Sequence, residues 1–159
     1  MRSTNGTHLL LAVLAAGCAG PQQTASDRVE PVPIGSGTLI VEVEGLRSSE
    51  GTIHVGLFAG PEGFPQDAAA MVRSATMMLA EDSERAIRFE GLAYGDYAVA
   101  ALHDENASGA VDTGFLGIPK EGLGFSNNPR IGFGAPSFES CSVRFDAPEM
   151  ALRLRVRYF

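Results

Sequence analysis

The chain has 159 residues, of which 45% are hydrophobic and 19% are charged, so it can bury one core but is short for two domains. Its 12 Lys and Arg stand against 19 Asp and Glu, a net charge of -7, and this balance argues against nucleic-acid binding because phosphates need basic patches. The 19 Gly and 9 Pro favour short strands joined by turns over long helices.

The first 18 residues have the pattern of an export signal. Arg2 and the amino terminus supply positive charge, and the apolar run at residues 9–16 is far shorter than the ~20 residues that span a bilayer. The run ends in small residues before Cys18, which resembles the bacterial lipobox, although Ala15 stands where that box usually has Leu. The resemblance implies that the Cys18 thiol receives diacylglycerol and that Cys18 becomes the new N-terminus. Ordinary signal-peptidase cleavage after a small residue is the alternative.

The residues after Cys18 bear on which membrane the protein reaches and on how the folded domain is attached to it. Ala19 stands where an Asp indicates retention at the inner membrane, so the same resemblance implies an outer-membrane lipoprotein facing the periplasm or the cell surface. Residues 19–37 are rich in Pro and Gln and poor in large apolar side chains, which predicts a flexible tether. One folded domain is then expected over residues 38–159.

From Thr38 onward, apolar residues recur at every second position, which is the pattern of half-buried strands. The turn-forming segment 47–51 predicts a hairpin between the first two strands. Residues 65–79 have weaker helical spacing and predict one helical turn before another strand near Met77. The expected core residues are Leu39, Val41, Val43, Ile53, Val55, Leu57, Ile87, Phe89, Tyr97, Val99, Ala101, Leu152, Leu154, Val156 and Tyr158.

Strands with one apolar face need a second sheet to cover that face. The pattern therefore predicts an all-β fold, an antiparallel β-sandwich of about seven strands that is transthyretin- or immunoglobulin-like. The stretch 91–99 is similar to the Gly-x-Tyr strand entry of transthyretin-like and peptidase-associated sandwiches. This resemblance implies a tyrosine corner, in which the Tyr97 ring lies in the core and its hydroxyl bonds the backbone.

The segment 103–139 is long for a connection in a small domain, and such loops are usually functional or packed by their own side chains. Its large apolar residues indicate that this Gly- and Phe-rich loop packs over one end of the sandwich. A rim that binds a glycan or a peptide is the alternative, with polar groups above aromatic faces. The candidate ligand-binding residues are Lys120, Phe125, Asn127, Asn128 and Arg130.

The start of this loop, Asp104-x-Asn106-x-Ser108-Gly109-x-x-Asp112, has oxygen-bearing side chains at the spacing of an EF-hand-type loop. The final bidentate Glu is missing, so Glu121 or Glu139 would have to supply it. A polar turn, in which these side chains bond their own backbone, is the alternative and the commoner structure. The candidate calcium ligands are Asp104, Asn106, Ser108, Ala110 and Asp112.

No catalytic residue is predicted. His54 and His103 are lone histidines, which more often serve as hydrogen-bonded structural residues than as bases or metal ligands. The sequence contains no Ser-His-Asp spacing, nucleophile elbow or phosphate loop. Cys141 is expected to be a small buried residue.

The last strand carries a basic stripe on its outer face, formed by Arg153, Arg155 and Arg157. We expect these side chains to pair with Glu42 and Glu44 on a neighbouring strand, which is an ordinary solvated arrangement. Contact with anionic lipid headgroups is the alternative.

Several short motifs occur in an order that is typical of one bacterial family. They begin with His103-Asp104-Glu105-Asn106, continue at residues 117–122 and 124–128, and end at residues 133–139. With the strands before and after, this set resembles the family called domain of unknown function 2141 over about residues 37–159. The resemblance implies an exported, single-domain β-sandwich and brings no established reaction, substrate or catalytic residue.

We therefore expect a non-enzymatic binding or accessory module of the cell envelope, anchored to the membrane by lipid. Its expected partner is a glycan, a peptide or an envelope protein, and not nucleic acid. No cofactor is expected unless the segment 104–112 binds calcium. The alternatives are a calcium-stabilised accessory domain, a small envelope enzyme and a purely structural envelope protein.

Overall fold

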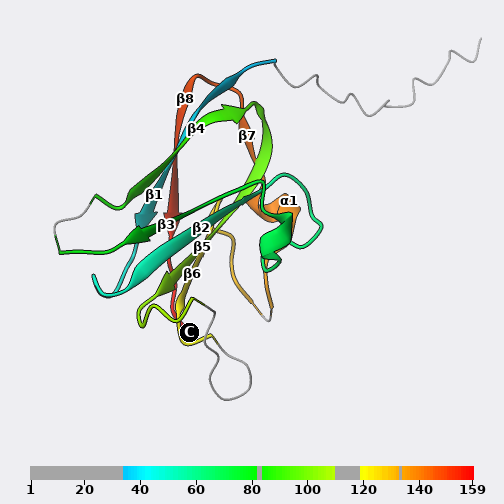
Figure 1. Cartoon of the computed structure of the whole chain (residues 1–159). Coiled ribbons are helices and arrows are strands. Elements are labelled where there is room, and N and C mark those ends of the chain that lie inside the picture. Colours follow the sequence, from blue (N-terminus) through cyan, green and yellow to red (C-terminus); the bar gives the residue numbers. More distant parts are fainter. Residues whose placement is uncertain (1–33, 82–83, 110–118, 133) are drawn as a thin grey trace, which may run out of the picture. The chain divides into compact units, whose positions relative to one another are not determined.

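The computed structural model describes residues 34–81, 84–109, 119–132 and 134–159. The proposed signal and most of the proposed tether lie outside these residues. Eight strands and two short helices make up the described chain (Figure 1). They are β1 (Ser36–Glu44), β2 (Thr52–Phe58), the 3-10 helix η1 (Ala68–Ala70), β3 (Arg73–Met78), β4 (Ala86–Ala93), β5 (Gly95–Asp104), β6 (Gly122–Phe125), α1 (Phe138–Cys141), β7 (Val143–Phe145) and β8 (Glu149–Arg155).

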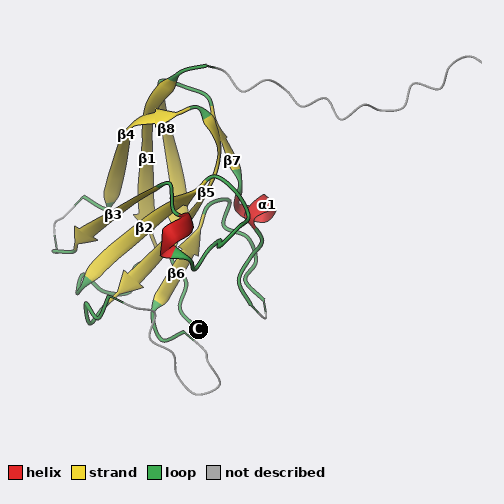
Figure 2. Ribbon diagram, turned by 45° about the vertical axis from the view of Figure 1, so that its right-hand side comes forward, coloured by secondary structure: helices red, strands yellow, loops and turns green. Residues whose placement is uncertain are grey.

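The strands form two facing sheets, so the predicted all-β sandwich is confirmed (Figure 2). One sheet has the order β4-β1-β8, and the other has the order β3-β2-β5-β6, with β7 paired to the first residues of β5. Among the described strands, every pair is antiparallel except β1–β8. This pair is parallel because β8 returns to β1 only after the chain has passed through the other sheet, and parallel pairing requires such a long connection.

The hairpin predicted at residues 47–51 is wrong, because β1 and β2 belong to different sheets. The segment instead carries the chain from one layer to the other. Turn-forming residues mark a change of direction in both cases, so the local pattern does not distinguish a hairpin from a crossing between layers. The helical turn and strand predicted within residues 65–79 are confirmed as η1 and β3.

The main core lies between the sheets and contains the residues that the two-residue alternation selects. Leu39, Val41, Ile53 and Leu57 have no solvent exposure. The predicted tyrosine corner is also confirmed: the Tyr97 ring is buried, and its hydroxyl donates a hydrogen bond to the carbonyl oxygen of Ala93 at 2.9 Å. This bond joins the end of β4 to the start of β5 across a tight turn.

A second, smaller core covers the outer face of the β3-β2-β5-β6 sheet. Ala98, Phe125 and Cys141 are its buried members, and Phe64 and Phe138 pack against them. The Phe64 ring lies edge-on to Phe58, with ring centroids 5.1 Å apart. The described part of the Gly- and Phe-rich loop is thus packed by its own side chains, as predicted, but on the outer face of this sheet and not over one end of the sandwich. Strand β5 is buried on both faces.

Candidate functional site

Two buried carboxyl groups meet where the long loop leaves and rejoins the sheet. His103 pairs with Gly122 in the antiparallel register of β5 and β6, so the next pair outward is Asp104 and Glu121. Asp104 is 0% exposed and Glu121 is 4% exposed, and their side chains hydrogen-bond. The Nε2 atom of His54 lies 3.7 Å from Oδ2 of Asp104. These groups form the base of the loop.

Asp104 is held in its charged form by its neighbours. Burial raises the pKa of this carboxyl, but hydrogen bonds from the backbone N–H groups of Gly109 and Ser108 and from Glu121 outweigh it, and the pKa lies below its usual value. The backbone bonds measure 2.7 Å from Gly109 and 3.1 Å from Ser108. The carboxylate therefore shapes the first turn of the loop.

The candidate calcium ligands are placed only in part. Asp104 points into the turn, and Oδ1 of Asn106 accepts a hydrogen bond from the backbone N–H of Ser108 at 3.0 Å. Ala110 and Asp112 lie outside the described residues. Within the described ranges, no group of three or more His, Cys, Asp and Glu side chains could hold a metal ion. Calcium binding stays a prediction.

Both histidines make structural hydrogen bonds. His103 is fully buried, with Nε2 2.9 Å from the carbonyl oxygen of Glu50 and Nδ1 2.5 Å from the Tyr158 hydroxyl. Because a carbonyl only accepts, Nε2 carries the proton and Nδ1 accepts from Tyr158. His54 bonds the hydroxyl groups of Thr52 and Thr76, each at 2.9 Å.

A shallow open hollow of about 270 Å³ lies beside this network, lined by Arg47, Glu105, Asn106, Lys120 and Glu121. Nε of Arg47 donates to both carboxylate oxygens of Glu105 at 3.1 and 3.0 Å, and its Nη2 also contacts Glu105. The guanidinium lies 4.2 Å from the centre of the Tyr158 ring, a cation–π contact. The ion pair of Arg47 and Glu105 therefore forms a charged wall of the hollow.

Sequence reasoning did not identify Arg47, Glu105 or Tyr158 as site residues, and Tyr158 was expected only on the core face of the last strand. These residues come from three separate segments: the β1–β2 connection, the start of the β5–β6 loop and the C-terminal end. No spacing rule links them. The folded chain brings them together, because the Arg47 guanidinium contacts both the Glu105 carboxylate and the Tyr158 ring.

Glu105 predicts an acid-dependent loss of stability. The hydrogen bond from Arg47 lowers its pKa from 4.5 to about 2, with a further contribution from Ser48. A depressed carboxyl pKa stabilises the fold above pH 4.5, and that contribution is lost as the pH falls from 4.5 towards 2. The melting temperature of the wild type should therefore fall more steeply over this range than that of Glu105→Gln. Equal slopes would contradict the assignment. The difference should be small, since half of the Arg47 side chain is exposed.

The candidate ligand-binding residues separate into two groups. Lys120 is exposed at the hollow, and Arg130 is also exposed. Phe125 is 5% exposed and lies in the second core. Asn127 donates to the carbonyl oxygen of Ser142 at 2.8 Å. Asn128 donates to the carbonyl oxygen of Arg153 and accepts from the backbone N–H of Arg155.

These asparagine bonds have a structural consequence. The Asn128 side chain reproduces the pattern of a paired strand along the open edge of β8. A bridge between Leu123 and Arg157 closes the same side of the sandwich. Both asparagines have positive φ, which Asn tolerates better than most residues. Whether the five candidates bind a ligand stays a prediction.

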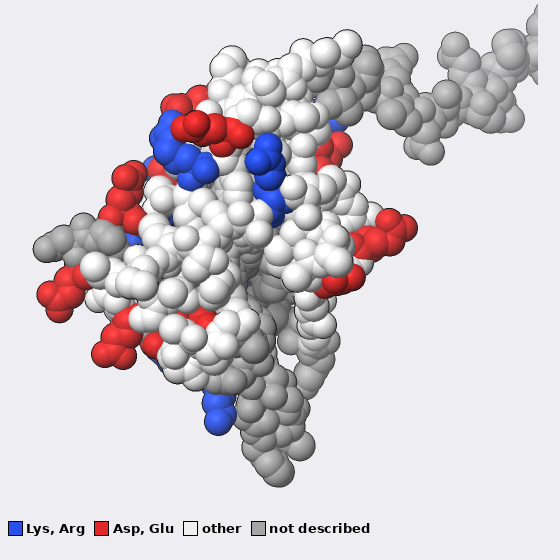
Figure 3. All heavy atoms as spheres, viewed as in Figure 1, with Lys and Arg blue, Asp and Glu red and all other residues white. Residues whose placement is uncertain are grey.

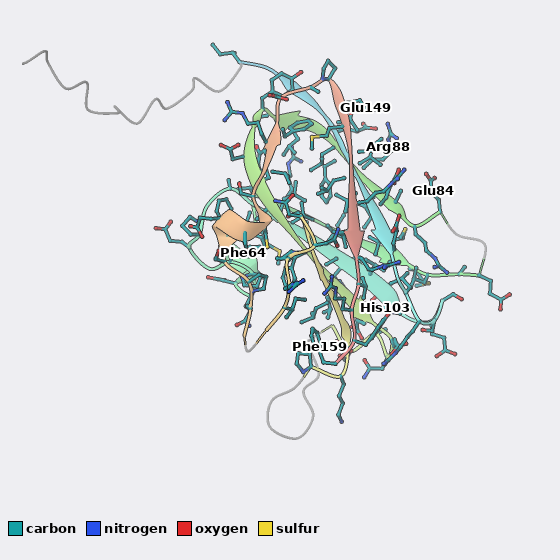
Figure 4. All side chains as sticks on the ribbon, turned by 180° about the vertical axis from the view of Figure 1, so that it is seen from behind. Phe64, Glu84, Arg88, His103, Glu149 and Phe159 are labelled. Carbon is teal, nitrogen blue, oxygen red and sulfur yellow. The ribbon has the colours of Figure 1, made fainter. Side chains whose placement is uncertain are left out.

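The remaining expectations concern side chains outside the hollow. Cys141 is free and buried, as expected. Nε of Arg153 donates to Glu42 at 2.6 Å, which confirms the predicted cross-strand pair, and Arg155 lies opposite Glu44 in the register. Arg88 and Glu149 form a similar pair at 2.9 Å across β1 (Figure 4). The outer face of the β4-β1-β8 sheet therefore carries ordinary cross-strand pairs of opposite charge.

Comparison with known proteins places the chain by family alone. Among the described residues, no helix has the length and apolarity to cross a bilayer. No curated protein and no solved structure is significantly similar to the chain. The family model that matches, over residues 41–153, is described as an uncharacterized protein conserved in bacteria, DUF2141. Since the match covers most of the sequence and ends within β8, the chain belongs to the DUF2141 family of bacterial proteins.

Proposed function

We propose that this chain is an exported, lipid-anchored and non-enzymatic binding or accessory module of the bacterial cell envelope. The anchor is Cys18, the membrane is the outer membrane, and the ligand is a glycan or a peptide. The observation that carries the proposal is the hollow lined by Arg47, Glu105, Asn106, Lys120 and Glu121.

The chemistry of the hollow supports binding more than catalysis. The ring nitrogens of His54 and His103 all make hydrogen bonds within the fold, and Arg47 is held by Glu105 and Tyr158. Fixed polar groups hold hydrogen-bonding ligands at low entropic cost. An envelope enzyme would instead need titratable groups that converge on a reacting atom. A purely structural envelope protein would need no such wall.

The anchor is tested by replacing its thiol. Cys18→Ser should release the protein from the membrane fraction, because one thioether-linked diacylglycerol supplies the attachment. The control is Cys141→Ala, since Cys141 is buried in the folded domain and should leave membrane association unchanged. Fractionation with mass analysis of the N-terminus measures both. Membrane association that survives Cys18→Ser would exclude the lipid anchor.

The binding role is tested with a panel of oligosaccharides and peptides in a thermal-shift assay, followed by calorimetry. Lys120→Ala should raise the dissociation constant of a bound ligand about tenfold, which corresponds to a loss of roughly 1.4 kcal/mol of binding free energy. Arg153→Ala is the control, because Arg153 lies on the outer face of the other sheet and pairs with Glu42. A ligand that binds both variants equally lies elsewhere on the protein.

Calcium binding is the second candidate, and the meeting of Asp104 with Glu121 favours it. The sequence pattern lacks its last acidic ligand, and the register of β5 and β6 places Glu121 beside the first one. Calcium prefers such carboxylate oxygens, and here it would take the place of the proton through which the two buried carboxyl groups hydrogen-bond. In this role calcium would order the loop without taking part in chemistry.

Calcium is expected to raise the melting temperature. At a free concentration about 100 times the dissociation constant, the stabilisation is about 2.7 kcal/mol. The measurement compares calcium with a chelator in the wild type and in Glu121→Gln, which keeps the shape of the side chain but cannot become a carboxylate ligand. A shift that is absent from the wild type, or unchanged in Glu121→Gln, would exclude this site.

A further inference from the structure

Strand β3 forms one edge of its sheet and has no strand beyond it in the described chain. It pairs with β2 in a continuous register from Thr52–Met78 to Leu57–Arg73. The N–H of Leu79 donates to the carbonyl oxygen of Gly51 at 3.0 Å. Gly51 and Leu79, which lie next to the Thr52–Met78 pair, are therefore a hydrogen-bonded pair. Antiparallel ladders alternate, and the backbone groups of Ser74, Thr76 and Met78 therefore point away from β2.

The other described edges are covered or charged. The Asn128 side chain bonds the backbone of β8, and the Leu123–Arg157 bridge joins β6 to the C-terminal end. Strand β4 carries exposed Arg88 and Glu90, and charges on an edge discourage the addition of another strand. Strand β3 has one charged residue, Arg73, at its first position.

Apolar side chains lie at both ends of β3. Val72 is 48% exposed and Met78 is 79% exposed, and these are two of the few large hydrophobic residues exposed in the described chain. The face around β2 and β3 shows few charged side chains (Figure 3). An unpaired edge with apolar ends is a template for strand addition.

The sequence of this edge complements itself in the antiparallel direction. A two-fold axis at Ala75 sets Ser74 opposite the partner's Thr76 and Val72 opposite the partner's Met78. The same axis places the two Arg73 side chains at opposite ends, so no like charges meet. Hydroxyl pairs and apolar pairs across strands are stabilising, and a two-fold contact requires this kind of self-complementarity.

We propose that β3 pairs with β3 of a second copy of this chain, forming a continuous sheet across a symmetric dimer. A contact of one short strand lies at the small end of protein interfaces, so the dimer is weak and forms at high concentration. Attachment to a membrane would raise the local concentration and favour it. The dimer does not depend on the anchor or on the ligand proposed above.

The test is sedimentation velocity of the purified chain over a wide range of concentration. Ser74→Pro removes one outward N–H and leaves the bonds to β2 in place, since proline is tolerated on the free side of an edge strand. Ser74→Ala is the matched control, because it keeps the backbone donor. Met78→Lys is a second variant that adds a charge to the edge without changing the backbone.

The wild type and Ser74→Ala should dimerise with similar dissociation constants. Ser74→Pro and Met78→Lys should raise that constant by about tenfold or more. If Ser74→Pro fails to fold by circular dichroism, the result for Met78→Lys decides. A wild type that stays monomeric at the highest concentration, or a Met78→Lys variant that dimerises like the wild type, would overturn the proposal.

Discussion

Replacing Phe58 with Ala is expected to lower the free energy of unfolding by about 3–5 kcal/mol. The Phe58 side chain has no solvent exposure and lies on the outer face of β2, where it supports Phe64. The Phe64 ring in turn contacts Phe125 and Phe138, with centroids 6.2 and 6.0 Å away. Loss of the Phe58 ring therefore leaves a cavity beneath the second core. Urea denaturation followed by circular dichroism measures the change.

Phe159→Ala is the matched control for this prediction. It removes the same side chain from a position that is 54% exposed, so it should change stability by less than about 1 kcal/mol. Equal effects of the two substitutions would show that the outer face of β2 is not a true core. In that case the loop would not be anchored on the sheet.

Gly51→Ala is expected to destabilise the protein by about 3 kcal/mol or more. Gly51 has φ +75°, and a Cβ atom there would lie 2.0 Å from the carbonyl oxygen of Asp104. Gly51 directly precedes β2, whose first residue Thr52 pairs with Asp104, so neither backbone can move without disturbing the Asp104–Glu121 pair. The same variant should reduce the order of the loop, which amide hydrogen exchange at residues 105–109 measures.

Gly91→Ala separates the cost of the positive φ from the cost of the steric clash. Gly91 also has a positive φ, +62°, but no atom lies within 4 Å of a Cβ atom placed there. Only the backbone strain remains, at roughly 1–2 kcal/mol. If the two substitutions cost the same, the close approach of Gly51 to Asp104 contributes nothing and the loop base is looser than described.

Sequence patterns predicted the strands and the main core well. Leu39, Val41, Ile53 and Leu57 are buried because alternation reports which face of a strand avoids water. Tyr97 was identified by a short local motif, and its hydrogen bond to Ala93 spans only a turn. The pairing of Arg153 with Glu42 followed from opposite charges on outer faces.

Sequence analysis predicted only those parts of the candidate site whose residues lie close together in the sequence. Asp104, Asn106 and Ser108 lie close in sequence, and their turn geometry follows from side chains that bond nearby backbone. The wall formed by Arg47, Glu105 and Tyr158 was missed, because its members have no fixed spacing. Asn128 was considered as a ligand residue, and its bonds to β8 depend on a strand far along the chain.

The amino-acid order alone thus specified an all-β domain, the inward face of each strand and the corner at Tyr97, because these depend on contacts within a few residues. Only the three-dimensional fold decided that residues 47–51 cross between layers, that Phe58 is buried on the outer face of β2, and that Glu121 meets Asp104. Which strands become neighbours depends on how distant segments bury their surfaces together, and a period-two pattern carries no information about its partner.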